Sequence, residues 1–161
     1  MPIISGGEPT FSTNNQVPRW HGIENPFGDV WTIVDGILIT SSIDENGDKY
    51  NKVYATDDPL LYNDFDYSKM RIVGVESNDL GYIKEWDLGD TAEIIPRLIG
   101  ADPVQYKCDA YWSNHTVPLR IVIFGGNASG NNGVGLGNFD SSLNPTNAYY
   151  HFGFRSSCII K

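Results

Sequence analysis

The sequence predicts an α+β domain made mainly of short antiparallel strands, with one or two short helices and long loops. Apolar and polar residues alternate over short stretches, as in half-buried strands. No window keeps an apolar stripe at helical spacing for three turns. The chain also carries 17 Gly and 9 Pro among its 161 residues, with 12% aromatic and 19% charged residues. This composition is typical of a single, turn-rich folded domain.

Alternation of apolar and polar residues defines the expected strands. They fall at residues 30–40, 49–56, 71–76, 81–87, 106–113, 120–124 and 152–160. In the stretch 106–113 we expect the even-numbered side chains to face the core, because they form the more apolar of the two faces. This set consists of Tyr106, Cys108, Ala110 and Trp112, and the opposite set of Lys107, Asp109, Tyr111 and Ser113.

Turn signals separate these strands and mark the domain boundary. Asn46-Gly47, within the segment 44–48, is a strong hairpin signal, and Asp35-Gly36 is a weaker one. Short helices are expected around residues 25–30 or 59–67. Residues 1–16 are mostly Gly, Ser, Thr, Asn and Pro, which predicts a linker or N-terminal arm. The folded domain is then expected to occupy residues 17–161.

The charge balance excludes two classes of partner. The 11 Lys and Arg residues against 20 Asp and Glu give a net charge of −9, which repels nucleic-acid phosphates and anionic lipid headgroups. No apolar stretch approaches the roughly 20 residues of a membrane span. We therefore expect neither nucleic-acid binding nor membrane insertion.

The two cysteines leave two interpretations open. Cys108 and Cys158 lie 50 residues apart, and neither belongs to a CxxC motif or a Cys/His cluster. They are either two buried thiols or a disulfide. No zinc site is expected from them.

Catalytic and cofactor motifs are not recognisable in the sequence. There is no G-x-S-x-G elbow and no Gly-Lys-Ser/Thr after the glycines Gly133, Gly135 and Gly137. The acidic turn at 44–48 lacks the distal Glu of a calcium loop. We therefore expect no enzyme activity, no cofactor and no metal. An enzyme acting on polysaccharide stays a minor alternative, through the carboxylates Asp57, Asp58, Asp64 and Asp66.

The segment 125–150 differs from the rest of the chain. It contains six Gly, six Asn and three Ser, with one charged residue, and predicts a long ordered loop region. Amides, hydroxyls and phenol rings combine adaptable hydrogen bonding with rigid contact area, as in antibody-like binding surfaces. The expected ligand-binding residues are Asn127, Asn131, Asn132, Asn138, Asp140, Asn144, Asn147, Tyr149 and Tyr150.

Two stretches resemble known families. Residues 19–31 read R-W-H-G-I-E-N-P-F-G-D-V-W and precede Asp35-Gly36. They resemble the R-x-x-G-I-E-N-x-F-G-x-x-W-x-x-x-D-G opening of tail and receptor-binding proteins of bacteriophages of gut bacteria. The stretch F-G-G-N at 124–127 and G-F-R at 153–155 resembles the ending of C-type-lectin-like domains of the formylglycine-generating-enzyme type. This group includes the variable proteins made by diversity-generating retroelements.

The resemblance implies a C-type-lectin-like fold, in which the N- and C-terminal strands lie together and long loops form a binding face. It does not carry over catalysis, because Cys108 and Cys158 do not match the cysteine pair of the enzyme branch. The calcium-dependent lectin motif has only a partial counterpart, Tyr62-Asn63-Asp64.

These observations together predict a receptor-binding (adhesin) domain of a bacteriophage tail or fibre protein, exposed on the virion. The expected partners are a bacterial surface glycan or protein, bound through residues 125–150, and other tail subunits. Multivalent display, for example as a homotrimer, would strengthen a modest affinity per site. The alternative is a structural baseplate or decoration domain whose loops contact a neighbouring subunit.

Overall fold

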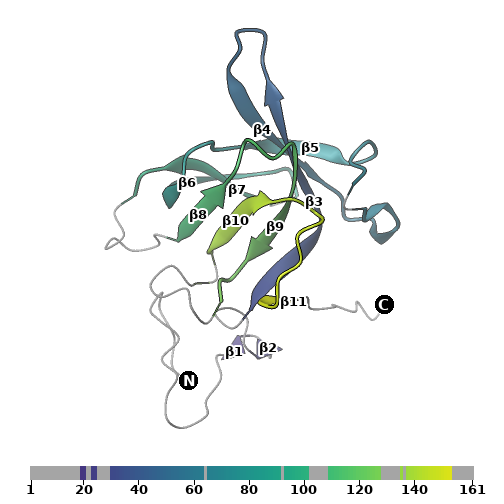
Figure 1. Ribbon diagram of the computed structural model, residues 1–161, viewed down its shortest axis with the longest axis vertical. Helices are drawn as coiled ribbons and strands as arrows, with labels where there is room; N and C mark the ends of the chain where they lie inside the picture. Colours follow the sequence, from purple (N-terminus) through teal and green to yellow (C-terminus); the bar gives the residue numbers. More distant parts are fainter. Residues whose placement is uncertain are drawn as a thin grey trace.

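A computed structural model describes residues 19–20, 23–24, 30–63, 65–91, 93–101, 109–127, 135 and 137–153. In this part of the chain, β1 (Arg19–Trp20) and β2 (Ile23–Glu24) form a two-stranded sheet, and the other strands join in one nine-stranded sheet (Figure 1). The larger sheet contains β3 (Trp31–Ile43), β4 (Lys49–Ala55), β5 (Arg71–Glu76), β6 (Gly81–Leu88), β7 (Ile94–Ile99), β8 (Ala110–Ser113), β9 (Leu119–Phe124), β10 (Phe139–Leu143) and β11 (Phe152–Gly153).

The expected α+β class is wrong, because the described residues contain no α-helix. The segment expected to be helical at 59–67 forms only a three-residue 3₁₀ turn, η1 (Pro59–Leu61). Asp58 caps this turn by accepting a hydrogen bond from the Leu60 amide, and Tyr62 returns to an extended conformation with ψ 108°. The other expected helix, at 25–30, lies outside the described residues except for its last one. The fold is therefore almost entirely β, and not the α+β C-type-lectin-like fold.

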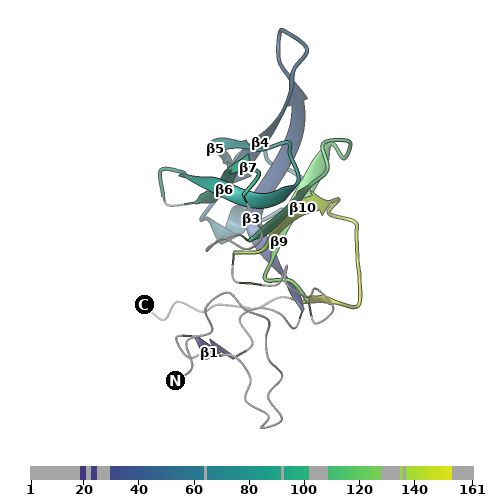
Figure 2. The ribbon, with the colours of Figure 1, turned by 90° about the vertical axis from the view of Figure 1, so that its left-hand side faces the viewer.

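The large sheet curls into a nearly closed barrel. Its strand order is β5-β4-β3-β9-β10-β8-β6-β7, and β11 pairs with β3. The two ends of this order approach each other, so that β5 and β7 lie side by side (Figure 2). The Ser77 amide, directly after β5, donates to the Pro96 carbonyl at 2.9 Å. We call this junction the β5/β7 seam.

Two apolar clusters cover the two faces of the curled sheet. Ile39, Val53 and Val122 come from the neighbouring strands β3, β4 and β9, and Ile95 from β7 at one end of the strand order meets them, so that the four fill the interior. A second cluster, Leu38, Met70, Ile121 and Ile123, lies on the outer face, where Trp31, Leu143 and Phe152 pack against it. Neighbouring residues of β9 thus point to opposite faces, as strand geometry requires.

The Asn46-Gly47 hairpin is confirmed. The Asp44 amide donates to the Asp48 carbonyl at 2.9 Å, and Asp44 Oδ1 accepts from the Asn46 and Asp48 amides at 2.8 Å each. Gly47 adopts φ 89°, which suits glycine. This β3–β4 hairpin projects beyond the barrel (Figures 1 and 2).

The weaker hairpin signal, Asp35-Gly36, is wrong. These residues lie inside β3, where the pairing with β9 shifts between Val34 and Leu38. Gly36 has φ 79°, and a Cβ there would lie 2.7 Å from both the Thr56 carbonyl oxygen and the Tyr62 ring. The glycine permits a bulge in a continuous strand, in place of a reversal.

The expected orientation of the strand at 106–113 is also wrong for Tyr111, Trp112 and Ser113, although Ala110, expected in the core, is buried at 6% exposure. Tyr111 and Ser113 are 0% and 8% exposed and face the interior, whereas Trp112 is 39% exposed on the outer face. The reason is that this end of the barrel interior is polar. Assigning the two faces of this strand by hydrophobicity alone therefore places Trp112 on the interior face, which is wrong.

Candidate ligand-binding face

The segment 125–150 is not one long loop. Its centre forms β10, which pairs in parallel with β8 and antiparallel with β9. Two of its glycines, Gly135 and Gly137, lie against the Asp109 side chain, so closely that a Cβ at either position would collide with the carboxylate. The Asp109 carboxylate would repel a phosphate or any other anion, so these glycines do not form an anion site.

The predicted binding residues lie in different environments. Asn138, directly before β10, is 1% exposed, whereas Tyr149 and Tyr150 are 47% and 98% exposed. Asn127, Asp140, Asn144 and Asn147 are partly buried. Asn131 and Asn132 lie outside the described residues, as do Cys108 and Cys158.

Asn144 and Asn147 build the turn that follows β10. The Asn144 amide donates to Asn147 Oδ1 at 2.8 Å, and the Asn147 amide donates to the Asn144 carbonyl at 2.9 Å. Asn144 Oδ1 also accepts from the amide and the hydroxyl of Thr146 at 2.9 and 2.8 Å. Their side-chain oxygens therefore hold the loop, which positions the aromatic residues that come next.

Four consecutive ring-bearing residues follow this turn. Tyr149 stacks on His151 at 5.4 Å between ring centroids, with an interplanar angle of 9°. Phe152 meets both Tyr149 and His151 edge to face at 5.0 Å. Tyr150 contacts His151 in the same way and is otherwise open to solvent.

This aromatic group continues onto the sheet. Phe152 is the parallel partner of Trp31 in the β11–β3 pair. The Trp31 ring in turn meets the Trp112 ring edge to face at 6.0 Å. Trp112 is the parallel partner of Asp140, so these two side chains lie side by side on the outer face. We name the set Trp31, Trp112, Asp140, Tyr149, Tyr150, His151 and Phe152 the aromatic face.

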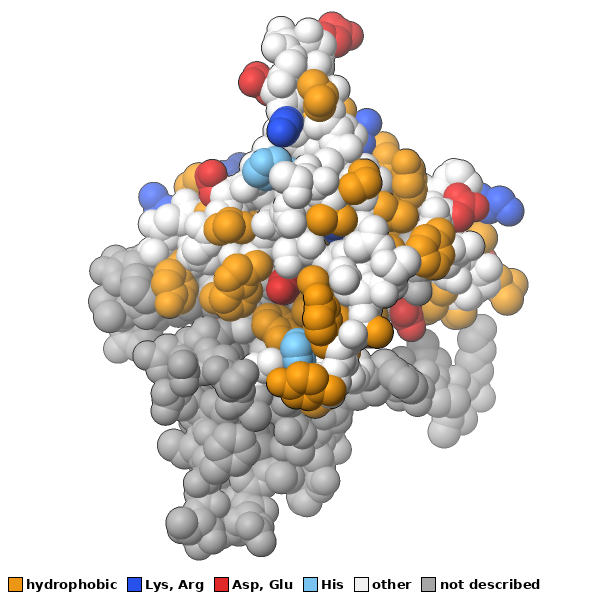
Figure 3. All heavy atoms as spheres, viewed as in Figure 1, with side chains coloured by type: hydrophobic (Ala, Val, Ile, Leu, Met, Phe, Trp, Pro, Cys, Tyr) orange, Lys and Arg blue, Asp and Glu red, His pale blue; other side chains and the backbone are white. Residues whose placement is uncertain are grey.

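Asp140 is the acidic residue of the aromatic face. Its Oδ1 accepts a hydrogen bond from the Ser142 amide at 2.7 Å. Burial raises the pKa of Asp140, and the hydrogen bonds from Ser142 oppose this shift. Within the described part of the chain, no lysine, arginine or histidine forms an ion pair with this carboxylate. On the face drawn in Figure 3, an acidic side chain and a histidine lie among hydrophobic side chains near the lower edge of the described part.

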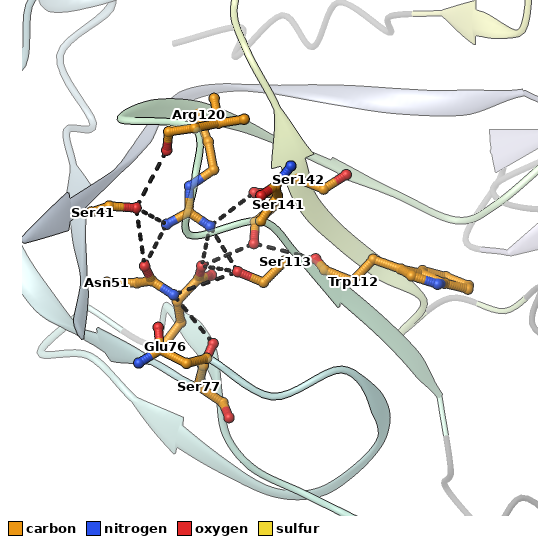
Figure 4. Close-up of polar contacts among 12 residues, drawn as sticks. Ser41, Asn51, Glu76, Ser77, Trp112, Ser113, Arg120, Ser141 and Ser142 are labelled. Carbon is orange, nitrogen blue, oxygen red and sulfur yellow. Dashed lines mark hydrogen bonds and ion pairs between the residues drawn. The ribbon is translucent and has the colours of Figure 1, made fainter. Parts of the chain in front are cut away.

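A second polar cluster lies inside the barrel. Arg120 donates from Nη1 to Glu76 Oε1 at 3.1 Å and to Ser113 Oγ at 2.7 Å, and from Nη2 to Asn51 Oδ1 at 2.7 Å. The Ser141 hydroxyl also donates to Glu76 Oε1, at 2.9 Å. Figure 4 shows these side chains converging on the guanidinium, while Trp112 points away from them. We call this cluster the interior network.

We interpret the interior network as structural, because its charged side chains are fully buried and a substrate could not reach them. The side chains of Arg120 and Glu76 are both 0% exposed. Burial raises the pKa of Glu76 to about 7, against the effect of the Arg120 charge. Burial and the nearby Glu76 also raise the pKa of Tyr111, whose hydroxyl donates to the Ser77 carbonyl at 2.9 Å.

Neither a membrane-spanning helix nor a metal-binding group emerges from the described residues. No helix among them is long and apolar enough to cross a membrane. They also contain no group of three or more His, Cys, Asp or Glu side chains placed to hold a metal ion.

Comparison of the chain with family models, curated proteins and solved structures found no match. The aromatic face is therefore the feature on which a proposed function can rest. Of the expected ligand-binding residues, Asp140, Tyr149 and Tyr150 lie in the aromatic face, whereas its members Trp31, Trp112, His151 and Phe152 were not among the expected residues. The two tryptophans were missed because only the strand pairing brings them next to Asp140.

Proposed function

We propose that this protein is a non-catalytic recognition domain that binds a ligand on a bacterial surface, as the receptor-binding part of a bacteriophage tail or fibre protein. The observation that carries the proposal is the aromatic face. Tyr149, Tyr150 and Trp112 are 47%, 98% and 39% exposed and lie on one continuous surface. Aromatic rings supply much of the binding energy of recognition surfaces.

The surrounding structure suits binding better than chemistry. The rings of the aromatic face rest on a paired sheet and on a turn held by its own asparagines. Such a surface loses little conformational entropy when a ligand binds. The resemblance of residues 19–31 to phage tail proteins supplies the biological context. Several copies in one fibre, for example three, would multiply a modest affinity by raising the effective concentration.

Binding of the labelled full chain to a panel of gut bacteria tests this proposal. We expect Tyr149→Ala and Tyr150→Ala to reduce binding at least tenfold together, which corresponds to about 1.4 kcal/mol. Phe65→Ala is the matched control, because Phe65 is also an exposed ring, at 62%, but lies before β5. Equal binding by the double variant and the wild type would overturn the proposed site.

A structural virion domain is the second candidate, favoured by one feature. The β3–β4 hairpin projects beyond the barrel and ends β3 with Ile43, which is 65% exposed. Such an arm suits contact with a neighbouring subunit. Shortening the hairpin tip would then impair particle assembly and leave binding to bacteria unchanged. The opposite result would favour the adhesin.

A further inference from the structure

We propose that the aromatic face binds a ligand carrying a positively charged ammonium group, held against the exposed ring of Trp112 and beside the carboxylate of Asp140. This inference rests on the proposed recognition function and names the chemistry of its ligand.

The strand pairing places the three side chains together. Trp112 and Asp140 are direct partners in the parallel β8–β10 pair, so their side chains leave the sheet on the same face. The Trp31 ring stands edge-on to Trp112, with ring centroids 6.0 Å apart and an interplanar angle of 81°. Trp31 thus packs against the Trp112 ring and supports it, and the exposed part of Trp112, 39% of the residue, is left beside the carboxylate to receive a cation.

The charge on Asp140 needs a partner that the described chain does not supply. Asp140 Oδ1 accepts a hydrogen bond from the Ser142 amide, and no basic side chain of the described residues forms an ion pair with the carboxylate. The sequence from 121 to 153 contains no Lys or Arg at all. A carboxylate that is partly withdrawn from water without a counter-charge is costly. An ammonium ligand would remove this cost by supplying the missing charge.

The rings favour the same class of ligand. An ammonium group within about 6 Å of an aromatic centroid is attracted by the ring face, and tryptophan gives the strongest attraction. The net charge of −9 adds a long-range attraction for cations and opposes anionic ligands. A neutral sugar could stack on the same rings but would leave the Asp140 charge unpaired. The combination of rings and carboxylate therefore selects for a cation.

Isothermal titration of the full chain with paired probes tests the inference. Choline and glucosamine carry the cation on a quaternary and on a primary amine. Their neutral counterparts, 3,3-dimethyl-1-butanol and glucose, keep the shape and remove the charge. We expect at least one cation to bind at least tenfold more tightly than its neutral counterpart. The cation that binds more tightly indicates whether the natural ligand carries a quaternary ammonium group or a primary amine.

Variants locate the binding. Asp140→Asn and Trp112→Leu should each weaken binding of the cation at least tenfold, whereas the exposed Asp48→Asn in the hairpin turn is the control and should not change it. If a variant fails to fold by circular dichroism, the comparison of probes on the wild type still decides. Equal binding of cations and neutral counterparts, or no binding of either, would overturn the inference.

The outcomes separate this inference from the proposed function. If cell binding depends on Tyr149 and Tyr150 but the ammonium probes do not bind, the recognition function stands and the ligand class is wrong. If the probes bind at Asp140 but cell binding ignores both tyrosines, the ammonium site stands and the proposed adhesin surface is wrong.

Discussion

Arg120 and Glu76 form a 3.1 Å ion pair between two side chains that have no exposed surface. Glu76 Oε2 and Arg120 Nε have no hydrogen-bond partner in the described part of the chain. The pair is therefore incompletely compensated for its loss of hydration, which makes it a sensitive point of the fold.

Glu76 should make stability depend on pH. Its pKa is about 7 in the fold, against 4.5 for an ordinary glutamate. Between these values the unfolded chain releases the proton that the folded chain keeps, so the free energy of unfolding falls as pH rises from about 4.5 to 7. The difference is on the order of 3 kcal/mol at about 1.4 kcal/mol per unit. Urea denaturation between pH 4.5 and 8 measures it.

Glu76→Gln removes the titrating group, so this variant should lack the fall in stability across that pH range. Glu45→Gln, at the exposed hairpin tip, is the control and should keep it. An unchanged slope in Glu76→Gln would show that another group causes the pH dependence.

The ion pair should show strong coupling. Arg120→Met leaves the buried Glu76 carboxyl group without its cation and hydrogen-bond donor and is expected to destabilise the fold by about 3–5 kcal/mol. Adding Glu76→Met removes that carboxylate, so the double variant should be more stable than Arg120→Met alone. Urea denaturation of the four proteins of this cycle at pH 7.5 gives the coupling energy. Simple additivity would mean that the two side chains do not stabilise each other.

Gly36 should tolerate substitution less well than Gly47. Both have positive φ, 79° and 89°, so alanine at either position costs about 1–2 kcal/mol of backbone strain. At Gly36 the new Cβ also meets Thr56 and Tyr62, whereas at Gly47 nothing lies within 4 Å. We expect Gly36→Ala to lose a further 1–3 kcal/mol or so, measured by thermal denaturation. Equal losses would show that the bulge in β3 relaxes freely.

Gly137 and Asp109 should be coupled through space. A Cβ at Gly137 would overlap the Asp109 carboxylate, so Gly137→Ala is expected to cost about 1–3 kcal/mol. The same substitution in an Asp109→Ala background should cost less, because the obstructing group is gone. A cost that does not depend on residue 109 would place the strain elsewhere.

Local features of the fold were predictable from the sequence. The limits of β5, Arg71–Glu76, agree with the alternation, and Asn46-Gly47 specifies its turn by backbone geometry alone. Long-range features were not. β7 contains Pro96, which weakens a strand signal, and β10 lies within a Gly- and Asn-rich stretch. Both strands form because they pair with neighbouring strands: β7 with β6, and β10 with β8 and β9.

The interior network could not be recognised from the sequence, for a related reason. Its members come from six different strands, so no segment of the sequence shows them together: Ser41, Asn51, Glu76, Ser113, Arg120 and Ser141. The same network reversed the apparent polarity of β8 and put Trp112 outside. The sequence could therefore show the polar character and the two tyrosines of the segment 125–150, but not the tryptophans that lie next to it in the fold.

The β5/β7 seam has a mechanical consequence. Pro96 accepts the Ser77 amide but has no amide hydrogen to return, so the two strands cannot exchange bonds at this point. The cylinder is consequently weakest along this line, whereas β3 pairs with three strands, β4, β9 and β11. Force or thermal breathing should unzip the wall there first. Deuterium should enter the amides bordering that line before it reaches those of β3 and β9.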